Sequence, residues 1–524
     1  VKATRLVAGL VVVALLATVL FAALQLVGND SDGPLVGGAD SQAPAPTPSA
    51  QPGSTDPPTP ELAEFYSQQL EWSPCRDGFE CSTLTVPVDY QDPSGDTIEL
   101  ALLKDPADHP DDRVGSLVVN PGGPGAPGTS YAENSSFAFR DVIRERFDII
   151  GFDPRGTGDS DPVDCLSDSD LDAYVARDPD PDSPEEGQEF EQGNRALLQG
   201  CVANSDALVG HVSTVEAARD MDVLRAALGE SQLTYFGASY GTKLGSTYAD
   251  LFPDKVGRLV LDGAVDPSIG SRQLNVEQAA GFEVALRSYV QACVDQGDCF
   301  LGDSLDEGLG TIQGLIADVD EQSLPTSLGG RELAVGNAFY GLVAPLYNRD
   351  YWPLLDQALQ QALDGDGTTL LRLSDLYSSR ADDGTYTDNS AEAILAINCL
   401  DDPYSIPADQ VPDQIPEFEK ASPTFGRVFA WSLTNCEGVH TRASEPVPVV
   451  DAPGAAPIVV VGTTRDPATP YQWAVHLADQ LQSGVLITRD GDGHTGYNAG
   501  NDCVDEAVED YLIDGTVPPD GLDC

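Results

Sequence analysis

Basic side chains are scarce in this sequence. It has 27 Lys and Arg against 85 Asp and Glu in 524 residues, a formal net charge of −58 at pH 7. A surface that negative repels phosphate, so nucleic acid and anionic lipid headgroups are poor partners for the folded part. A chain of this length, 41% hydrophobic, is too large for a peptide hormone or a small disulfide scaffold and can bury a large core.

Histidine is rarer still, with five residues, and no Cys-x-x-Cys pair occurs. Protein metal sites usually draw on clustered Cys and His, so the sequence predicts no metal, and it implies no organic cofactor either. The ten cysteines are even in number and favour disulfides. Sequence alone does not settle their connectivity; pairing neighbours in order would give Cys75–Cys81, Cys165–Cys201, Cys293–Cys299, Cys399–Cys436 and Cys503–Cys524.

Polar residues are nearly absent from Leu6 to Val27, an apolar run that follows Lys2 and Arg5. Its length suits a membrane anchor or a long export signal, and both interpretations of residues 1–27 stay open. Residues 28–60 are mostly Pro, Ser, Ala, Gly, Thr and Asp, which predicts an extended tether. Together with the cysteines, this N-terminus predicts an exported protein that is either secreted or held at the cell envelope by a membrane tether through residues 6–27.

Apolar runs that end in glycine-rich turns alternate with helical stretches in the first half of the chain. The expected strands are residues 81–87, 97–104, 115–120, 147–152, 233–236 and 256–261. Near-continuous apolar strands that alternate with helices predict a mostly parallel sheet covered on both faces. Functional groups in such a sheet lie at the carboxyl ends of the strands.

The pattern changes between residues 265 and 450 to long amphipathic stretches without convincing strands. This segment predicts an α-helical lid inserted between the sixth and seventh strands. The α/β pattern resumes with strands at 457–462 and 484–488. We therefore predict an α/β protein with two core segments, 61–264 and 451–524, on either side of the lid.

Ser239 lies in a Gly-x-Ser-x-Gly pattern, Gly237-Ala-Ser-Tyr-Gly241. The pattern alone is weak, and its structural alternative is an N-capping serine. Here it follows an apolar strand and begins a helix, as a nucleophile elbow requires. Small residues two positions away fit this strained turn, so we predict that Ser239 is a nucleophile.

A serine nucleophile needs a base, and in strand–turn–helix hydrolases the order along the chain is Ser, acid, His. His109 and His211 precede Ser239 and are excluded by that order. His440 falls in the predicted lid and His476 within a predicted helix. His494 remains, in a small-residue loop directly after the last strand, and is the predicted base.

The acid that orients the base is expected at a strand end as well. Asp466 follows the strand before the one that leads to His494, and Asp262 is its rival after an earlier strand. The chain order favours Asp466. The oxyanion then needs two backbone N–H groups, for which we predict Tyr240 and Gly123, with Gly122 as the alternative to Gly123.

Several motifs now agree with a known family. They are Asn120-Pro-Gly-Gly-Pro-Gly125, Asp153-Pro-Arg-Gly-Thr-Gly-Asp-Ser160, the Ser239 elbow, Gly462-Thr-Thr-Arg-Asp-Pro-Ala-Thr-Pro470 and Gly493-His494. From about residue 65 to 524 the chain resembles the secreted tripeptidyl aminopeptidases of actinobacteria, within the α/β-hydrolase group that contains the prolyl iminopeptidases. Relatives often have His where Asn120 stands, but the glycines are intact.

This resemblance implies an α/β-hydrolase fold and an exopeptidase that removes short peptides from free amino termini, with a carboxylesterase as the alternative. A substrate ammonium needs a carboxylate partner. The predicted lid offers Glu277, Glu283 and Asp401, the last in a segment similar to one usual in the family. We predict that Asp401 or Glu283 binds the ammonium. The sequence does not indicate an oligomeric state.

Overall fold

The computed structural model describes residues 51–524 except 77, 439 and 440. The predicted anchor or signal at 6–27, most of the predicted tether and His440 lie outside the described residues. Within the described part, none of the helices combines the length and the apolar character needed to cross a membrane.

In the described residues, ten strands form one sheet in the order β1-β2-β3-β5-β4-β6-β7-β10-β11-β12. The pairings β1–β2, β2–β3 and β3–β5 are antiparallel, and the other pairings in this sheet are parallel. The strands are β1 (Ser73–Arg76), β2 (Phe79–Pro87), β3 (Thr97–Asp105), β4 (Gly115–Asn120), β5 (Phe147–Phe152), β6 (Leu233–Ala238), β7 (Val256–Asp262), β10 (Ile458–Arg465), β11 (Gly484–Asp492) and β12 (Leu522–Asp523). The mostly parallel sheet confirms the predicted α/β-hydrolase fold.

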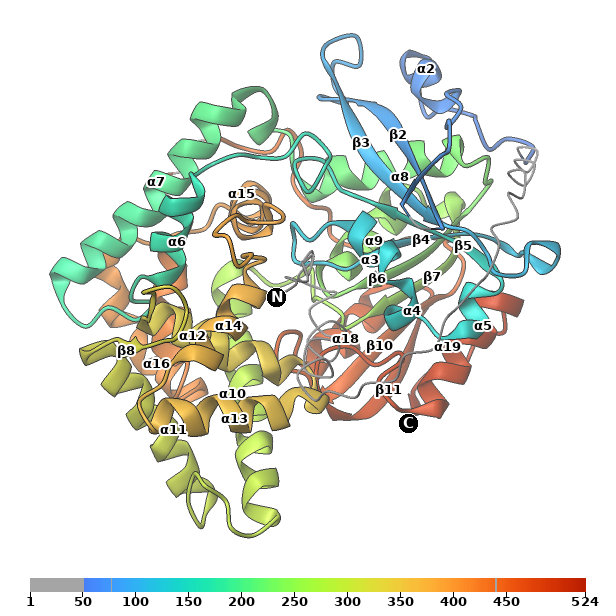
Figure 1. Ribbon diagram of the computed structural model, residues 1–524. Helices are drawn as coiled ribbons and strands as arrows, with labels where there is room; N and C mark the ends of the chain where they lie inside the picture. The colour runs from blue at the N-terminus through green and yellow to red at the C-terminus, as the bar shows by residue number, and fades with distance from the viewer. Residues whose placement is uncertain (1–50, 77, 439–440) are drawn as a thin grey trace, which may run out of the picture.

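Helices cover both faces of this sheet (Figure 1). One face packs on α8 (Thr214–Ala227), α9 (Tyr240–Leu251) and α18 (Tyr471–Gln480), the other on α3 (Gly128–Glu133), α4 (Ser135–Ala138), α5 (Asp141–Arg144) and α19 (Asp502–Asp514). Successive residues of a strand point to opposite faces. Val118 and Val460 accordingly lie in one core, and Val119 and Val459 in the other. Burial on both faces explains why these strands are continuously apolar.

The helical insertion lies between β7 and β10 and has its own apolar core. It contains α10 (Ser271–Asp295), α11 (Leu305–Glu321), α12 (Val335–Val343), η4 (Ala344–Tyr347), η5 (Arg349–Tyr351), α13 (Trp352–Leu363), α14 (Thr368–Tyr377), α15 (Ser390–Asp401), η6 (Ala408–Asp413), α16 (Ile415–Ala421), α17 (Gly426–Trp431), η7 (Ser432–Thr434) and a two-stranded sheet of β8 (Leu324–Pro325) and β9 (Glu332–Leu333). It follows the seventh strand of the chain and not the sixth, because β1 was not among the strands predicted from the sequence. The residues of β1 are all exposed and give no apolar signal.

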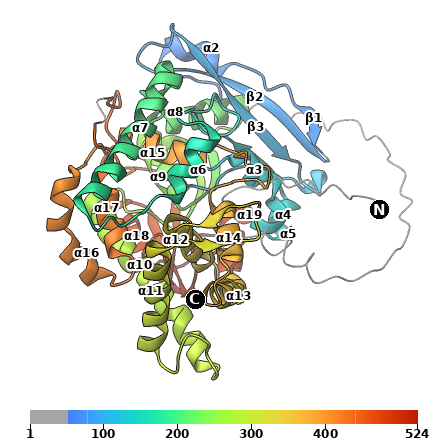
Figure 2. The ribbon, with the colours of Figure 1, turned by 60° about the vertical axis from the view of Figure 1, so that its left-hand side comes forward.

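Two helices from the first core segment join the insertion. They are α6 (Asp168–Ala176) and α7 (Pro184–Val209), which lie beside α12 and α15 (Figure 2). Phe190 of α7 lies in the apolar core of the insertion. The helical layer over the strand ends is therefore assembled from two separate stretches of sequence. The remaining short helices are η1 (Pro60–Leu62), α2 (Ala63–Tyr66), η2 (Pro110–Asp112) and η3 (Pro253–Lys255).

Residues 51–60 differ from the extended tether that the sequence predicted. The backbone N–H of Gln51 donates to the carbonyl of Gly229 at 2.8 Å. Ser54 is buried, and its carbonyl accepts a hydrogen bond from Arg225 at 2.9 Å. This part of the chain is therefore attached to the core through hydrogen bonds of its backbone to the backbone of Gly229 and the side chain of Arg225, which composition alone does not reveal.

All ten cysteines form disulfides, and each pairs with its neighbour in the chain: Cys75–Cys81, Cys165–Cys201, Cys293–Cys299, Cys399–Cys436 and Cys503–Cys524. The pairing in order is confirmed. Five disulfides in one chain are typical of proteins outside the reducing cytosol.

Candidate active site

Ser239 lies on a strained turn between β6 and α9, with φ 57° and ψ −126°. Left-handed backbone of this kind is costly for a residue with a side chain and is frequent at functional sites. The turn is also crowded, because a Cβ on Gly237 would lie 2.4 Å from the carbonyl oxygen of Gly241. The two glycines permit this close approach, as the elbow motif predicts.

Near Ser239, two backbone N–H groups have no hydrogen-bond partner among the described residues. Tyr240 is the first residue of α9, so its N–H has no partner within the helix. In the turn after β4, the N–H of Gly122 donates to Oδ1 of Asn120 at 2.9 Å. The N–H of Gly123 has no hydrogen-bond partner among the described residues, and Gly123 lines the same cavity as Ser239. This difference favours Gly123 over Gly122.

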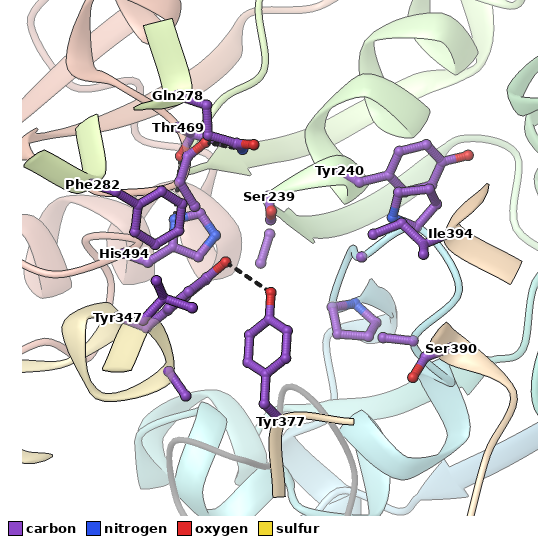
Figure 3. Close-up of a pocket in the computed structure, with 18 of the residues that line it drawn as sticks. Ser239, Tyr240, Gln278, Phe282, Tyr347, Tyr377, Ser390, Ile394, Thr469 and His494 are labelled. Carbon is purple, nitrogen blue, oxygen red and sulfur yellow. Dashed lines mark hydrogen bonds between the residues drawn. The ribbon is translucent and has the colours of Figure 1, made fainter. Parts of the chain in front are cut away.

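His494 and Asp466 meet at the carboxyl ends of β10 and β11. Nδ1 of His494 lies 2.9 Å from both carboxylate oxygens of Asp466. Nε2 of His494 is buried and has no partner within the described part of the chain. Figure 3 shows the imidazole next to Ser239, with Tyr240 on the other side of the serine. The structure thus brings Ser239, His494 and Asp466 together, as their positions in the sequence predict.

The surroundings of His494 shift its pKa. Burial of the imidazole lowers the pKa, but the negative charge of Asp466 and its hydrogen bond outweigh burial, so the pKa is raised above the ordinary 6.5. A histidine that acts as a base must be neutral, and this one loses its proton only above that ordinary value.

The acid limb of kcat/KM is therefore expected above pH 6.5, with activity falling as the pH drops through it. The measurement is a pH profile of kcat/KM on a peptide whose own charge is constant across the range. Asp466→Asn supplies the control, since loss of the carboxylate charge is expected to move the limb of the residual activity to lower pH. A limb below 6.5 in the unaltered protein would contradict the raised pKa.

Two contacts of His494 were not predicted from the sequence. Oγ1 of Thr469 lies 3.0 Å from Oδ2 of Asp466 and 3.2 Å from Nδ1 of His494. Tyr347, in the helical insertion, accepts the backbone N–H of His494 at 2.7 Å through its carbonyl, and its ring packs edge-on against the imidazole at 5.4 Å. In the sequence, the only indication that Thr469 belongs to the site was its place in the Asp466 motif, and nothing indicated Tyr347. The insertion thus contacts the candidate base directly.

Asp262, the rival acid, supports the loop that carries His494. Its carboxylate accepts the backbone N–H groups of Gly496 at 2.7 Å and of Tyr497 at 2.9 Å. Burial raises its pKa to about 6. Asp466 therefore contacts the imidazole, whereas Asp262 fixes the backbone that follows it.

A cavity of about 950 Å³ lies between the strand ends and the helical insertion. The core contributes Gly123, Ser239, Tyr240 and His494 to its wall. The insertion contributes several aromatic side chains, among them Phe282, Tyr347 and Tyr377 (Figure 3). The cavity is large enough for a short peptide or a bulky ester.

The two carboxylates predicted to bind a substrate ammonium do not line this cavity. The side chain of Asp401 is 1% exposed, and its carboxylate binds Nζ of Lys243 at 2.6 Å and both the N–H and the hydroxyl of Thr214. Glu283 is buried and accepts hydrogen bonds from Ser422 at 2.8 Å and from the N–H of Thr424. The rejected alternative, Glu277, accepts hydrogen bonds from Trp473 and Gln273. Asp401 and Glu283 lie within the packing between helices, a property that their sequence context does not reveal.

A serine on a strand-to-helix elbow beside a histidine–aspartate pair, at the carboxyl ends of a mostly parallel sheet, defines a serine hydrolase of the α/β-hydrolase fold. A family described as "TAP-like protein" matches residues 422–524. The serine protease Hip1 of Mycobacterium tuberculosis is 39% identical over 483 residues, which cover 87% of this chain and 91% of the relative.

Two further relatives match along a similar length. Carboxylesterase B of Mycobacterium tuberculosis is 37% identical, covering 88% of this chain and 91% of its own. The tripeptidyl aminopeptidase of Streptomyces lividans is 30% identical, covering 87% of this chain and 86% of its own. The chain belongs to the TAP-like family of α/β hydrolases.

Proposed function

We propose that this protein is an exported serine exopeptidase that releases short peptides, tripeptides in the first place, from free amino termini. The observation that carries the proposal is the arrangement of His494. Its Nδ1 is held by both oxygens of Asp466, and its Nε2 is unpartnered among the described residues, next to Ser239. Relatives named as a serine protease and a tripeptidyl aminopeptidase support a peptidase, and the five disulfides support export.

The proposed reaction proceeds through an acyl-enzyme. Oγ of Ser239 attacks the scissile carbonyl carbon while Nε2 of His494 takes the hydroxyl proton, and Asp466 stabilises the imidazolium. The N–H groups of Tyr240 and Gly123 donate to the oxyanion. His494 returns the proton to the leaving amine as the C–N bond breaks. Water, deprotonated by His494, then hydrolyses the ester and releases the acyl peptide.

The test compares three substrates of the purified protein: a tripeptidyl amide with a free amino terminus, its N-acetylated twin and a short-chain ester. We expect cleavage of the free-amino peptide in preference to the acetylated one, and its loss in Ser239→Ala. Turnover of the ester with neither peptide cleaved would refute the exopeptidase and establish the carboxylesterase, which the relative named carboxylesterase B favours.

Asp350 is the better candidate for binding the substrate ammonium. Four carboxylates line the cavity: Asp262, Asp350, Asp402 and Asp492. Asp262 and Asp402 accept hydrogen bonds from backbone or hydroxyl groups, and Asp492 binds Arg349 and Arg465. The exposed carboxylate of Asp350 has no partner within the described part of the chain. We propose that it, rather than Asp401 or Glu283, binds the amino terminus.

Asp350→Asn is expected to lower the preference for the free-amino peptide over its acetylated twin about tenfold, through KM, because an amide lacks the charge that attracts an ammonium. The measurement is kcat/KM on both peptides. Asp401→Asn and Glu283→Gln are the matched variants and are expected to keep the preference. Loss of the preference in either of these two variants, with Asp350→Asn unaffected, would restore the prediction from sequence.

A further inference from the structure

Arg489 lines the cavity and forms no ion pair with the residues that the structure describes. Four basic side chains line the cavity: Arg177, Lys243, Arg349 and Arg489. Lys243 is paired with Asp401 and Arg349 with Asp492. Arg177 is stacked on the rings of Tyr174 and Phe190, at 3.8 and 4.0 Å. Arg489 has neither a carboxylate within 4.0 Å nor an aromatic partner in the residues that the structure describes.

Two backbone carbonyls fix the guanidinium of Arg489. Nη1 donates to the carbonyl of Asp492 at 3.1 Å and Nη2 to that of Ala499 at 2.9 Å. Its Nε–H has no acceptor in the described residues, and the side chain is partly buried. Partly buried charges are normally paired. No carboxylate of the described residues lies within 4.0 Å of this guanidinium, although the charges of Asp262, Asp492 and Asp466 act on it from further away. Its remaining N–H groups are therefore available to a carboxylate from outside the protein.

Arg489 is hydrogen-bonded to the loop that carries His494. Residues 492 and 499, to which it binds, flank His494, and His494 is the group that returns a proton to the leaving amine. The cavity wall continues there with Asn498 and Phe137, which are joined by a 2.9 Å hydrogen bond from Nδ2 of Asn498 to the carbonyl of Phe137. Phe137 is 47% exposed at this rim.

We propose that Arg489 binds the terminal carboxylate of a short peptide substrate, on the part of the substrate that leaves with the new amino terminus. This rests on the proposed function. A guanidinium held by two carbonyls offers its remaining N–H groups in a fixed direction, and charge-assisted hydrogen bonds of arginine to carboxylates are among the strongest that proteins make. The protein then prefers short peptides, whose carboxyl end lies close to the scissile bond.

The experiment compares peptides that carry one, two or three alanines after the scissile bond, each with a free carboxylate or a carboxamide at the C-terminus. We expect kcat/KM at the best length to be at least about tenfold higher for the carboxylate, chiefly through KM. Arg489→Met is expected to reduce this ratio to about one, and Arg489→Lys to keep part of it. Arg177→Met, which removes another cavity arginine, is expected to keep the full ratio.

The ratio of kcat/KM for the carboxylate peptide to that for the carboxamide distinguishes substrate binding by Arg489 from a role in holding the loop of His494. If Arg489 only holds the loop of His494, Arg489→Met lowers the rates for both peptides equally and the ratio stays, which would overturn the proposal. A third peptide, with aspartate after the scissile bond and a carboxamide end, identifies the source of the carboxylate. If Arg489 raises kcat/KM only for the aspartate peptide, and not for peptides with a free C-terminal carboxylate, the proposal is overturned. The site then binds an acidic side chain of the substrate.

A binding measurement keeps the inference independent of turnover. Ser239→Ala is titrated calorimetrically with the best peptide and its carboxamide, and the same is done with Ser239→Ala/Arg489→Met. We expect about tenfold weaker binding of the carboxamide in the first protein and no difference in the second. Failure of the unaltered protein to cleave any peptide refutes the proposed function, whereas equal binding of both peptides by Ser239→Ala refutes the role of Arg489.

Discussion

Asp466→Asn is expected to lower kcat about 10⁴-fold while the protein stays folded. Both oxygens of Asp466 lie 2.9 Å from Nδ1 of His494. An asparagine of the same shape carries no charge to stabilise the imidazolium, and its amide nitrogen favours the wrong tautomer of the histidine. The readout is kcat on the tripeptidyl amide, with Ser239→Ala as the reference for loss of the nucleophile and thermal unfolding as the check of folding.

Asp262→Asn is the matched control, because it is a buried aspartate at the neighbouring strand end. Its carboxylate accepts N–H groups of the backbone after His494 and does not contact the imidazole. We expect a much smaller decrease in kcat than for Asp466→Asn, with a lower unfolding temperature from the lost hydrogen bond. A larger loss of kcat in Asp262→Asn would reverse the assignment of the acid.

The parts of the site that the sequence predicts are those with a local signal. Ser239 is bracketed by two glycines between an apolar strand and a helix, and His494 follows the last apolar strand. Each pattern depends on residues within a few positions, so it can be recognised from the sequence alone. The disulfides were also simple to pair, because each joins cysteines that are consecutive in the sequence.

Contacts between distant segments could not be predicted in the same way. Asp401 was expected to face a substrate, yet it binds Lys243, 158 positions earlier. In so acidic a chain, the sequence around a carboxylate does not indicate which basic residue it will pair with. The contact of Tyr347 with His494 likewise depends on how the insertion packs over the strand ends. The edge strand β1 was missed because it is exposed and therefore not apolar.

These two contacts connect the insertion to the helix that follows Ser239 and to the loop that carries His494. The pair of Asp401 and Lys243 joins α15 to α9, the helix that begins directly after Ser239. The contact of Tyr347 with His494 joins η4 to the loop after β11. The insertion therefore lines the cavity and also contacts the elements that carry the proposed nucleophile and base, so changes within it are expected to alter kcat as well as substrate preference.

Arg155→Met is expected to lower the free energy of unfolding by about 3–5 kcal/mol. Arg155 belongs to the Asp-Pro-Arg-Gly-Thr-Gly motif that contributed to the family resemblance, yet it does not line the cavity. Its side chain is fully buried and binds both oxygens of Asp220, at 2.6 and 2.7 Å, and three backbone carbonyls. Removal of the guanidinium leaves the buried carboxylate of Asp220 without its counter-charge, which is the main cost.

The measurement is denaturant unfolding of Arg155→Met beside two comparison variants. In Arg155→Met/Asp220→Leu the stranded carboxylate is gone as well, so part of the lost stability is expected to return. Arg272→Met breaks an exposed pair with Glu417, and its cost is expected to be about 1 kcal/mol or less. If Arg155→Met costs no more than Arg272→Met, the motif does not stabilise the fold through its buried charge pair.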